Sequence, residues 1–183
     1  MLSRLASSAR AAPFTRAFHS TALKMAPPRL NHTMFRIKDP KISLDFYTRI
    51  LGMELVHESP GGDFTNYFLA FPEEGKENMS KEEKSDRKFQ REGILELCHN
   101  YGTENDADFK YANGNEEPGR GFGHIAISVD DVEAECKRLD GLGVQFKKRP
   151  EEGRMKHIAF VYDPDRYWIE IVPNGGKKGE KGM

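Results

Sequence analysis

Hydrophobic and polar residues alternate along several short stretches of the chain, which is the pattern of strands that are buried on one face. Residues 32–37 and 124–129 show this pattern, and each stretch begins with a histidine, His32 or His124, on its less apolar face. Because the opposite face is mostly apolar, we expect it to pack on helices. The two histidines can then line a polar concavity.

Helical spacing follows each of these strands. Asp39 with Pro40 is a typical N-cap and first turn, and Gly52 ends the apolar periodicity. In the second half, Asp131 and Gly143 mark the same two points. Each half therefore consists of a strand, a helix and several further strands. The expected fold class is α+β, built from two βαβββ modules.

Matching offsets indicate that the two halves are a duplication. The capping aspartate lies seven positions after each histidine, and the glycine that ends the helix lies 20 positions after His32 and 19 positions after His124. Self-similarity of this kind is evidence about fold before it is evidence about function. The first half is longer because residues 72–92 form an insert of mixed charge, which predicts a solvated loop or helix.

One strand of each half carries a glutamate between aliphatic residues, Glu96 in Ile-Leu-Glu-Leu and Glu170 in Trp-Ile-Glu-Ile. An unpaired carboxylate is costly to bury, so such a residue normally has a cation or a metal as its partner. His32 and His124 stand at corresponding positions, and the two half-sites brought together make a His2Glu2 metal centre. Imidazole and carboxylate ligands suit Zn, Ni, Co, Mn or Fe(II), so the ligand types alone do not select the ion.

Composition and charge are those of an ordinary globular domain. Of the 183 residues, 37% are hydrophobic and 31% are charged, and the net charge is -1. This charge gives no reason to expect nucleic acid as a partner. No apolar run approaches the roughly 18 residues that a membrane span requires. Cys98 and Cys136 are expected to be free thiols in a reducing compartment, because two cysteines do not make a disulfide framework.

Residues 1–25 differ in kind from the rest of the chain, because they are rich in arginine, serine and threonine and contain no acidic residue. This composition predicts a mitochondrial transit peptide that directs the full-length precursor to the matrix. Within it, the segment 16–21 (Arg-Ala-Phe-His-Ser-Thr) resembles the two-step matrix processing signal, with cuts after Ala17 and after Met25. Initiation at Met25 is an alternative that gives a cytosolic form.

Six longer motifs follow one another in register along the two halves. They are His32-Thr-Met-Phe-Arg-Ile-Lys-Asp-Pro40, Leu44-Asp-Phe-Tyr-Thr-Arg-Ile-Leu-Gly52, Leu95-Glu-Leu-Cys-His-Asn100, Asn113-Gly-Asn-Glu-Glu117, Arg120-Gly-Phe-Gly-His124 and Asp163-Pro-Asp-Arg-Tyr-Trp-Ile-Glu170. Together they resemble the glyoxalase I family of lactoylglutathione lyases over about residues 31–173.

The resemblance implies the paired βαβββ fold of the vicinal oxygen chelate superfamily. It places one such domain at residues 26–175, with repeats at about 29–100 and 120–173, and leaves 176–183 as a disordered tail. It also implies a homodimer of the domain-swapped type, in which both chains contribute to each active site.

The reaction implied is isomerisation of the hemithioacetal of methylglyoxal and glutathione to S-D-lactoylglutathione, with glutathione as co-substrate. The family's metal ligands correspond to His32, Glu96, His124 and Glu170. A divalent metal stabilises the enediolate as a Lewis acid. Glu170 is the base that moves the proton between neighbouring carbons, and Glu96 serves the opposite face of the substrate.

Glutathione carries two carboxylates, so the site is expected to contain cations that are not metal ligands. Arginine suits this role because its fork binds a carboxylate through two hydrogen bonds. The contacts that the resemblance implies are Arg36, Asn100 and Arg120 at the γ-glutamyl end, Lys148, Arg154 and Met155 in the loop over the glycyl end, and His124.

Two positions depart from parts of the family, and one feature bears on the metal. Animal relatives have glutamine where His32 stands, whereas fungal and bacterial relatives have histidine, so coordination is retained. Arg166 occupies a position that is usually glycine, which puts the local turn in question. The insert at 72–92 resembles that of the longer, zinc-preferring members, so Zn²⁺ is expected, with Ni²⁺ and Co²⁺ as alternatives.

Two other classes of protein on this fold remain as alternatives. An extradiol-type dioxygenase uses an Fe(II) triad of two histidines and one carboxylate, whereas this chain offers a fourth ligand. A metal-free module that binds small molecules would lack most of the four ligands. Neither class accounts for the arginines, so the lyase is the expected activity.

Overall fold

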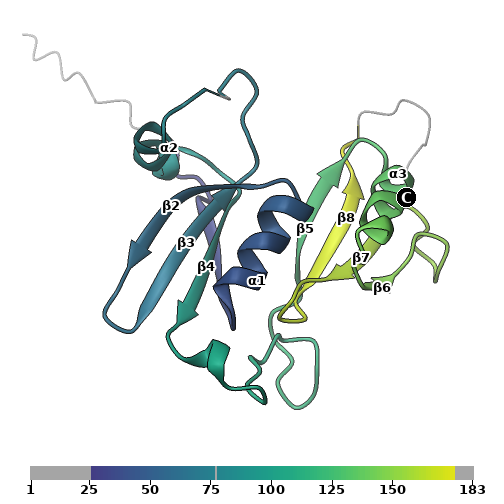
Figure 1. Cartoon of the computed structure of the whole chain (residues 1–183). Helices are drawn as coiled ribbons and strands as arrows, with labels where there is room; N and C mark the ends of the chain where they lie inside the picture. The colour runs from purple at the N-terminus through teal and green to yellow at the C-terminus, as the bar shows by residue number, and fades with distance from the viewer. Residues whose placement is uncertain (1–25, 77, 176–183) are drawn as a thin grey trace, which may run out of the picture.

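Two four-stranded sheets form the body of the molecule, with α1 lying between them (Figure 1). The computed structural model describes residues 26–76 and 78–175, so the expected transit peptide and C-terminal tail lie outside the described residues. The first half contains β1 (His32–Ile37), α1 (Pro40–Asp45), a π-helical turn (Phe46–Ile50), β2 (Glu54–Pro60), β3 (Phe64–Ala70), α2 (Lys81–Arg87), a 3-10 turn (Lys88–Gln90) and β4 (Ile94–Asn100). The second half contains β5 (His124–Val129), α3 (Val132–Gly141), β6 (Phe146–Lys148), β7 (Ala159–Tyr162) and β8 (Trp168–Pro173), and a 3-10 turn (Thr103–Asn105) lies between the halves.

The two sheets have the same topology. The strand order is β1-β4-β3-β2 in the first sheet and β5-β8-β7-β6 in the second. In each sheet the first and last strands of the repeat pair in parallel, and the remaining neighbours are antiparallel. The prediction of two βαβββ modules and an α+β fold is confirmed. Because the topology repeats, equivalent positions of the two halves have equivalent neighbours.

The helix that follows each histidine strand begins at the aspartate expected from the sequence. The carboxylate of Asp39 accepts hydrogen bonds from the backbone of the first turn of α1, and Asp131 does the same for α3. Gly52 and Gly143 follow the two helical segments with φ of 82° and 77°, a left-handed conformation that glycine adopts without strain. The first helical segment changes to π geometry at Phe46, which the sequence pattern did not indicate.

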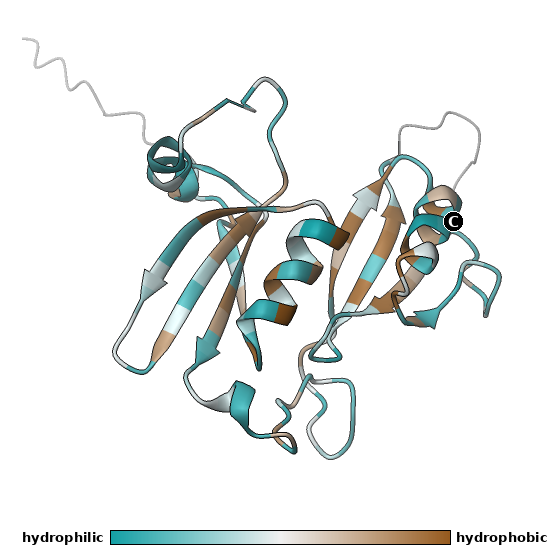
Figure 2. Ribbon diagram, in the orientation of Figure 1, coloured by the Kyte–Doolittle hydropathy of each residue, from teal (hydrophilic) through white to brown (hydrophobic). Residues whose placement is uncertain are grey.

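One apolar cluster joins the two halves. It contains Phe35 and Leu97 from the first sheet, Tyr47 from the turn after α1, and Ile169 and Ile171 from the second sheet. Apolar side chains alternate with polar ones along the strands, as expected (Figure 2). The apolar faces are therefore used for packing, and the faces that carry His32 and His124 stay more exposed.

A polar contact within this core links the β7–β8 turn to the first half. Tyr47 Oη donates to Asp163 Oδ2 over 2.8 Å, and the backbone N–H of Tyr167 donates to Asp163 Oδ1. Burial raises the pKa of Asp163 to about 7. Arg166 in the same turn has φ of 71°, and its guanidinium lies 3.5 Å from the centroid of the Tyr162 ring. Arg166 thus adopts the left-handed conformation that glycine favours, so the turn keeps this conformation with an arginine in place of glycine.

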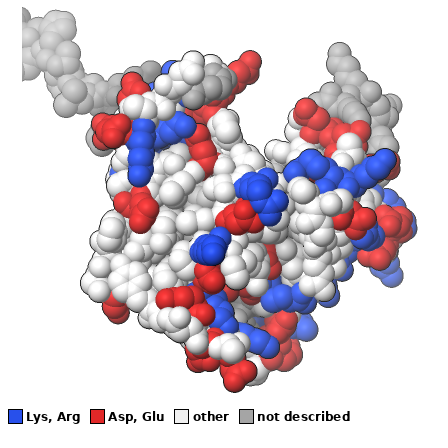
Figure 3. Space-filling view, viewed as in Figure 1, with Lys and Arg blue, Asp and Glu red and all other residues white. Residues whose placement is uncertain are grey.

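The charged insert contains the short helix α2, which begins with a capping box between Ser80 and Glu83. Lys84 Nζ lies 2.5 Å from Glu54 Oε2 on β2, so the helix is tied to the edge of the first sheet. On the face shown in Figure 3, positive and negative side chains are interspersed. Within the described residues, no helix is long and apolar enough to cross a membrane. Cys98 and Cys136 are free, as expected, and both are buried.

Candidate metal centre

The first histidine and the first glutamate lie on neighbouring parallel strands. In the register of β1 and β4, Met34 stands opposite Glu96, so His32 is two residues away on the same face. His32 Nε2 lies 3.1 Å from Glu96 Oε2. The His32 side chain is 37% exposed and the Glu96 side chain 11%. The imidazole is therefore accessible to solvent, whereas the carboxylate is largely buried.

The second pair repeats this geometry. Ala126 stands opposite Glu170, and His124 Nε2 lies 3.2 Å from Glu170 Oε2. A phenylalanine on the next strand packs edge-on against each imidazole, Phe68 against His32 and Phe160 against His124. These phenylalanines stand opposite the glutamates in the register, so the duplication extends to the aromatic support of each pair.

The spacing within each pair fits two ligands of one metal ion. Ligand atoms about 2.1 Å from an ion, at about 90 to 109° to each other, lie about 3.0 to 3.4 Å apart. The observed 3.1 and 3.2 Å fall in this range. In the described part of the chain, no three histidine, cysteine, aspartate or glutamate side chains are grouped closely enough to hold a metal. Each pair taken alone therefore offers two candidate ligands.

The carboxylate of Glu96 has a second support that Glu170 lacks. Asn66 Nδ2, on β3, donates to Glu96 Oε1 over 2.6 Å, which leaves Oε2 toward His32. Asn66 Oδ1 is buried and has no hydrogen-bond partner among the described residues, so an acceptor there is free for a ligand. Within the same residues, the Glu170 carboxylate has only the ion pair with His124. Glu96 is thus held more firmly than Glu170.

Two of the expected glutathione contacts lie together on the face of the first pair. Arg36 Nε donates to Asn100 Oδ1 over 3.3 Å, and Tyr111 Oη donates to the same oxygen. Cys98 lies between Glu96 and Asn100 on β4 and opposite Arg36. Burial raises the pKa of the Cys98 thiol, which disfavours the nucleophilic thiolate. The group suited to a carboxylate here is the guanidinium of Arg36.

The remaining expected contacts lie elsewhere in the chain. Arg120 precedes β5 and its guanidinium Nε lies 2.9 Å from Glu117 on a highly exposed loop. Lys148 ends β6, and its ammonium donates to the carbonyls of Arg149, Met155 and Ile158. It therefore holds the loop that contains Arg154 and Met155, and the Met155 side chain is exposed.

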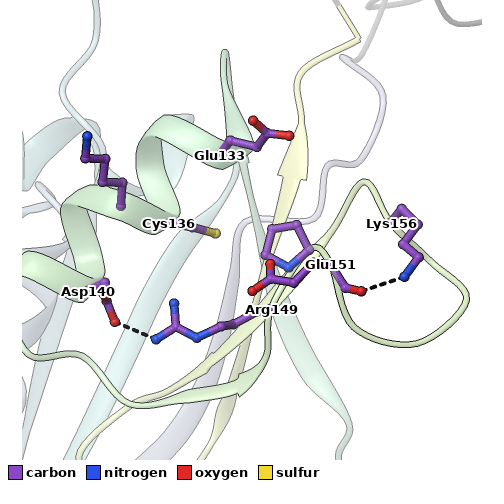
Figure 4. Close-up of a pocket in the computed structure, with 8 residues that line it drawn as sticks. Glu133, Cys136, Asp140, Arg149, Glu151 and Lys156 are labelled. Carbon is purple, nitrogen blue, oxygen red and sulfur yellow. Dashed lines mark hydrogen bonds and ion pairs between the residues drawn. The ribbon is translucent and has the colours of Figure 1, made fainter.

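A groove of about 510 Å³ lies between α3 and this loop, away from both His–Glu pairs. Figure 4 shows Arg149 reaching across it to Asp140, and the two side chains form an ion pair of 2.5 Å. Lys156 Nζ donates to the carbonyl of Glu151. Arg149 and Lys156, two of the cations that line the groove, thus already have partners, and none of the expected ligands lies there.

Sequence reasoning did not single out Asn31 or Asn66. Asn31 Oδ1 lies 2.8 Å from His32 Nδ1, and Asn66 donates to Glu96 as described above. Asparagine is disfavoured within strands, so Asn66 in the middle of β3 was a detectable signal. Asn31 carried no comparable signal, because asparagine is common just before a strand.

Comparison with known proteins agrees with this architecture. Residues 29–171 match the Glyoxalase/Bleomycin resistance protein/Dioxygenase superfamily. The chain is 49% identical over 144 residues to a lactoylglutathione lyase of Pseudomonas putida, covering 78% of this chain and 83% of that protein. It is 47% identical over 156 residues to the Schizosaccharomyces pombe lactoylglutathione lyase, covering 84% of this chain and 50% of that one, so it spans half the length of this relative.

Among solved structures, the trypanothione-dependent glyoxalase I of Leishmania major superposes with a TM-score of 0.59 at 29% identity, covering 80% of this chain and 87% of that chain. The duplicated βαβββ topology, the repeated His–Glu pairs and these similarities agree. The chain belongs to the glyoxalase/bleomycin resistance protein/dioxygenase superfamily.

Proposed function

We propose that the protein is a lactoylglutathione lyase, which isomerises the hemithioacetal of methylglyoxal and glutathione to S-D-lactoylglutathione. The observation that carries the proposal is the duplicated His–Glu pair, with Nε2 to Oε2 distances of 3.1 and 3.2 Å in a chain closely similar to lyases of this name. Each pair supplies two of the four ligands expected of this site.

The pairs come together between two copies of the chain in this proposal. His32 and Glu96 of one protomer face His124 and Glu170 of its partner, so a homodimer contains two complete sites. The absence of a three-ligand group within the described part of one chain supports this arrangement. The partly exposed side chains of all four residues support it too, because each pair is open on one side.

The two glutamates have different roles in this proposal, Glu96 as a fixed ligand and Glu170 as the base. Glu96 is fixed by Asn66 and His32, whereas Glu170 contacts only His124 among the described residues and is freer to move. Glu170 takes the proton from the carbon that bears sulfur and hydroxyl, and returns it to the neighbouring carbon that was the ketone. The hydroxyl proton passes to the former ketone oxygen, so the first carbon becomes the thioester carbonyl and the second bears the hydroxyl of the product. A divalent cation, when bound, would act as a Lewis acid toward the negative charge on the two substrate oxygens.

Arg36 then binds a carboxylate of glutathione. Its guanidinium lies on the face of the first pair and needs only to exchange the 3.3 Å contact with Asn100 for a charge-assisted one. Arg120 is the second candidate, from the exposed loop that precedes β5. Zinc is the proposed ion, because the charged insert around α2 resembles that of zinc-preferring family members and the donor set suits it.

Complementation between two inactive variants tests the shared site. A chain with Glu96→Ala and a chain with Glu170→Ala are each expected to be inactive, because every site of either homodimer lacks one carboxylate. In a mixed dimer one site contains both substitutions and the other contains neither. Random mixing is therefore expected to restore about a quarter of wild-type turnover of methylglyoxal plus glutathione.

Inactivity of the mixture, with mixed dimers verified by two affinity tags, would overturn the shared site. Wild-type protein without activity on methylglyoxal plus glutathione would overturn the lyase. Oxygen consumption with a catechol substrate would instead favour the dioxygenase class, and metal analysis of the purified protein decides between zinc and nickel or cobalt.

A further inference from the structure

The side chain of Asn31 connects the end of the charged insert to His32. Its Nδ2 donates to two backbone carbonyls, those of Lys88 and Arg91, each over 2.8 Å. Its Oδ1 lies 2.8 Å from Nδ1 of the His32 ring. The nitrogen of the Asn31 amide therefore contacts the insert, and its oxygen contacts the imidazole of His32.

This geometry assigns a role to the Nδ1 atom of the His32 ring. A backbone carbonyl only accepts hydrogen bonds, so the amide nitrogen of Asn31 must face Lys88 and Arg91, and both its hydrogens are used there. The oxygen that is left toward His32 cannot donate. For this hydrogen bond to form, Nδ1 of the ring must be the donor, and in that tautomer of the neutral imidazole the lone pair is on Nε2. Nε2 also faces an acceptor, the Glu96 carboxylate 3.1 Å away, so in the metal-free ring Asn31 and Glu96 favour opposite tautomers.

We propose that Asn31 is a positioning residue that fixes the Nδ1–H tautomer of His32 and couples the charged insert to the metal centre. The inference rests on the proposed function in one respect, that His32 is a metal ligand through Nε2. A ligating histidine normally donates its other ring N–H to an oxygen, which sets the tautomer and the orientation of the ring. Asn31 Oδ1 is that oxygen here.

The insert supplies a rigid support for this contact. The side chain of Arg91 is only 8% exposed, and its guanidinium lies 3.8 Å from Glu54 and 3.5 Å from Glu73. It also donates to the carbonyl of Phe71. Asn31 itself is fixed through its backbone carbonyl, which accepts from Ile94 at the start of β4. The acceptors of the Asn31 amide are therefore held in place.

The second half has no equivalent contact among the described residues. Asn115 Nδ2 donates to the carbonyl of Gly123, next to His124, but this bond is to the backbone and not to the ring. The two histidines thus have matching Nε2–Oε2 distances and different partners at Nδ1. His124 can serve as an internal control in an experiment on His32.

The test is nuclear magnetic resonance of the metal-free protein labelled with ¹⁵N-histidine, at a pH chosen so that the ¹⁵N shifts show neutral rings. In the wild type we expect His32 to have its proton on Nδ1. Asn31→Leu should shift His32 toward a mixture of tautomers and leave His124 unchanged. Asn31→Asp should keep the Nδ1–H tautomer, since its carboxylate still accepts, while it can no longer donate to the insert.

Zinc affinity, measured by chelator competition, gives the second readout. We expect Asn31→Leu to weaken binding about 10- to 100-fold, as is typical for loss of a partner that orients a ligand. Asn105→Leu is the matched control, because Asn105 is an exposed asparagine whose side chain donates to the neighbouring Glu104 side chain. It should change neither the His32 tautomer nor the affinity.

An Asn31→Leu protein that folds with the wild-type His32 tautomer would overturn the proposal. So would a wild-type His32 with its proton on Nε2, a result that does not depend on any variant folding. If the tautomer shifts as expected but the wild type lacks lyase activity, the proposed function fails and the role of Asn31 at the ring stands.

Discussion

Asn66 donates a 2.6 Å hydrogen bond to Glu96 Oε1, the carboxylate oxygen that does not face His32. Asn66→Leu keeps the size of the side chain and removes this donor. We expect about 10- to 100-fold weaker metal binding, because the carboxylate can then rotate out of the ligand position. Titration calorimetry of the metal-free protein measures the change.

Thr65→Val is the control for this variant. Thr65 adjoins Asn66 in β3, and its hydroxyl bonds to the Tyr101 hydroxyl on the opposite face of the sheet. Its loss should reduce stability slightly and leave metal affinity unchanged. Equal metal affinity of Asn66→Leu and Thr65→Val would rule out a positioning role for Asn66.

Glu170→Gln is expected to reduce turnover by at least about 100-fold, the usual effect of losing a general base. The amide can still hydrogen-bond to His124, so the fold and the dimer should be retained. Steady-state kinetics on methylglyoxal plus glutathione, with metal content measured in parallel, checks this. Near wild-type turnover at full metal content would contradict the role of Glu170 as base.

Arg36→Ala and Arg120→Ala are expected to weaken binding of S-alkyl glutathione inhibitors. Loss of a charge-assisted pair costs about 1.5 to 3 kcal/mol, which corresponds to about tenfold or more in affinity. Neither arginine contacts a His–Glu pair directly, so metal content should not change. Arg49→Ala, which removes an exposed ion pair with Asp45 on the same helical segment, is the control. Unchanged inhibitor affinity in both test variants would refute this placement.

The periodicity of the sequence was enough to predict the strands that carry the candidate ligands and the faces on which they lie. Side chains alternate strictly along a strand, so the position of Phe35 in the core fixes that of His32 on the other face. Both aspartate caps were likewise predictable, because an N-cap is a local interaction.

The hydrogen bonds that Asn66 and Asn31 make to the candidate ligands could not be predicted in this way. Asn66 reaches Glu96 only because β3 and β4 pair in a register that places Phe68 opposite Glu96, and the whole charged insert lies between these strands in the sequence. Asn31 contacts Lys88 and Arg91 because the last residues of the same insert lie beside the start of β1. Contacts that depend on the path of a long insertion are not encoded in local periodicity.

Targeting of the full-length chain to mitochondria is a further expectation, based on the acid-free composition of residues 1–25. We expect import of the precursor, cleavage to leave Ala26 at the start, and a cytosolic product from initiation at Met25. Cell fractionation and N-terminal sequencing of a chain tagged at its C-terminus measure both. Removal of residues 1–25 should leave activity intact, since they precede β1. A protein found only in the cytosol and starting at Met1 would contradict the transit peptide.

The buried carboxyl of Asp163 predicts a pH dependence of stability. Burial raises its pKa from 3.8 to about 7, so the folded state holds this proton more tightly than the unfolded chain does. The stabilisation from this group is therefore fully present below about pH 3.8 and is lost as the pH rises through about 7.

Comparison of the wild type with Asp163→Asn isolates this contribution. The groups that face Asp163 are Tyr47 and Tyr167, which are hydrogen-bonded to it, and the nearby Asp165, and all three remain in the variant. Between pH 8 and pH 5 we expect the free energy of unfolding of the wild type to rise relative to that of Asp163→Asn, by on the order of a few kcal/mol. Urea unfolding of both proteins at each pH measures the difference, and contributions from groups that the two proteins share cancel. Parallel pH profiles of the two proteins would show that Asp163 has the same proton affinity in the folded and unfolded states.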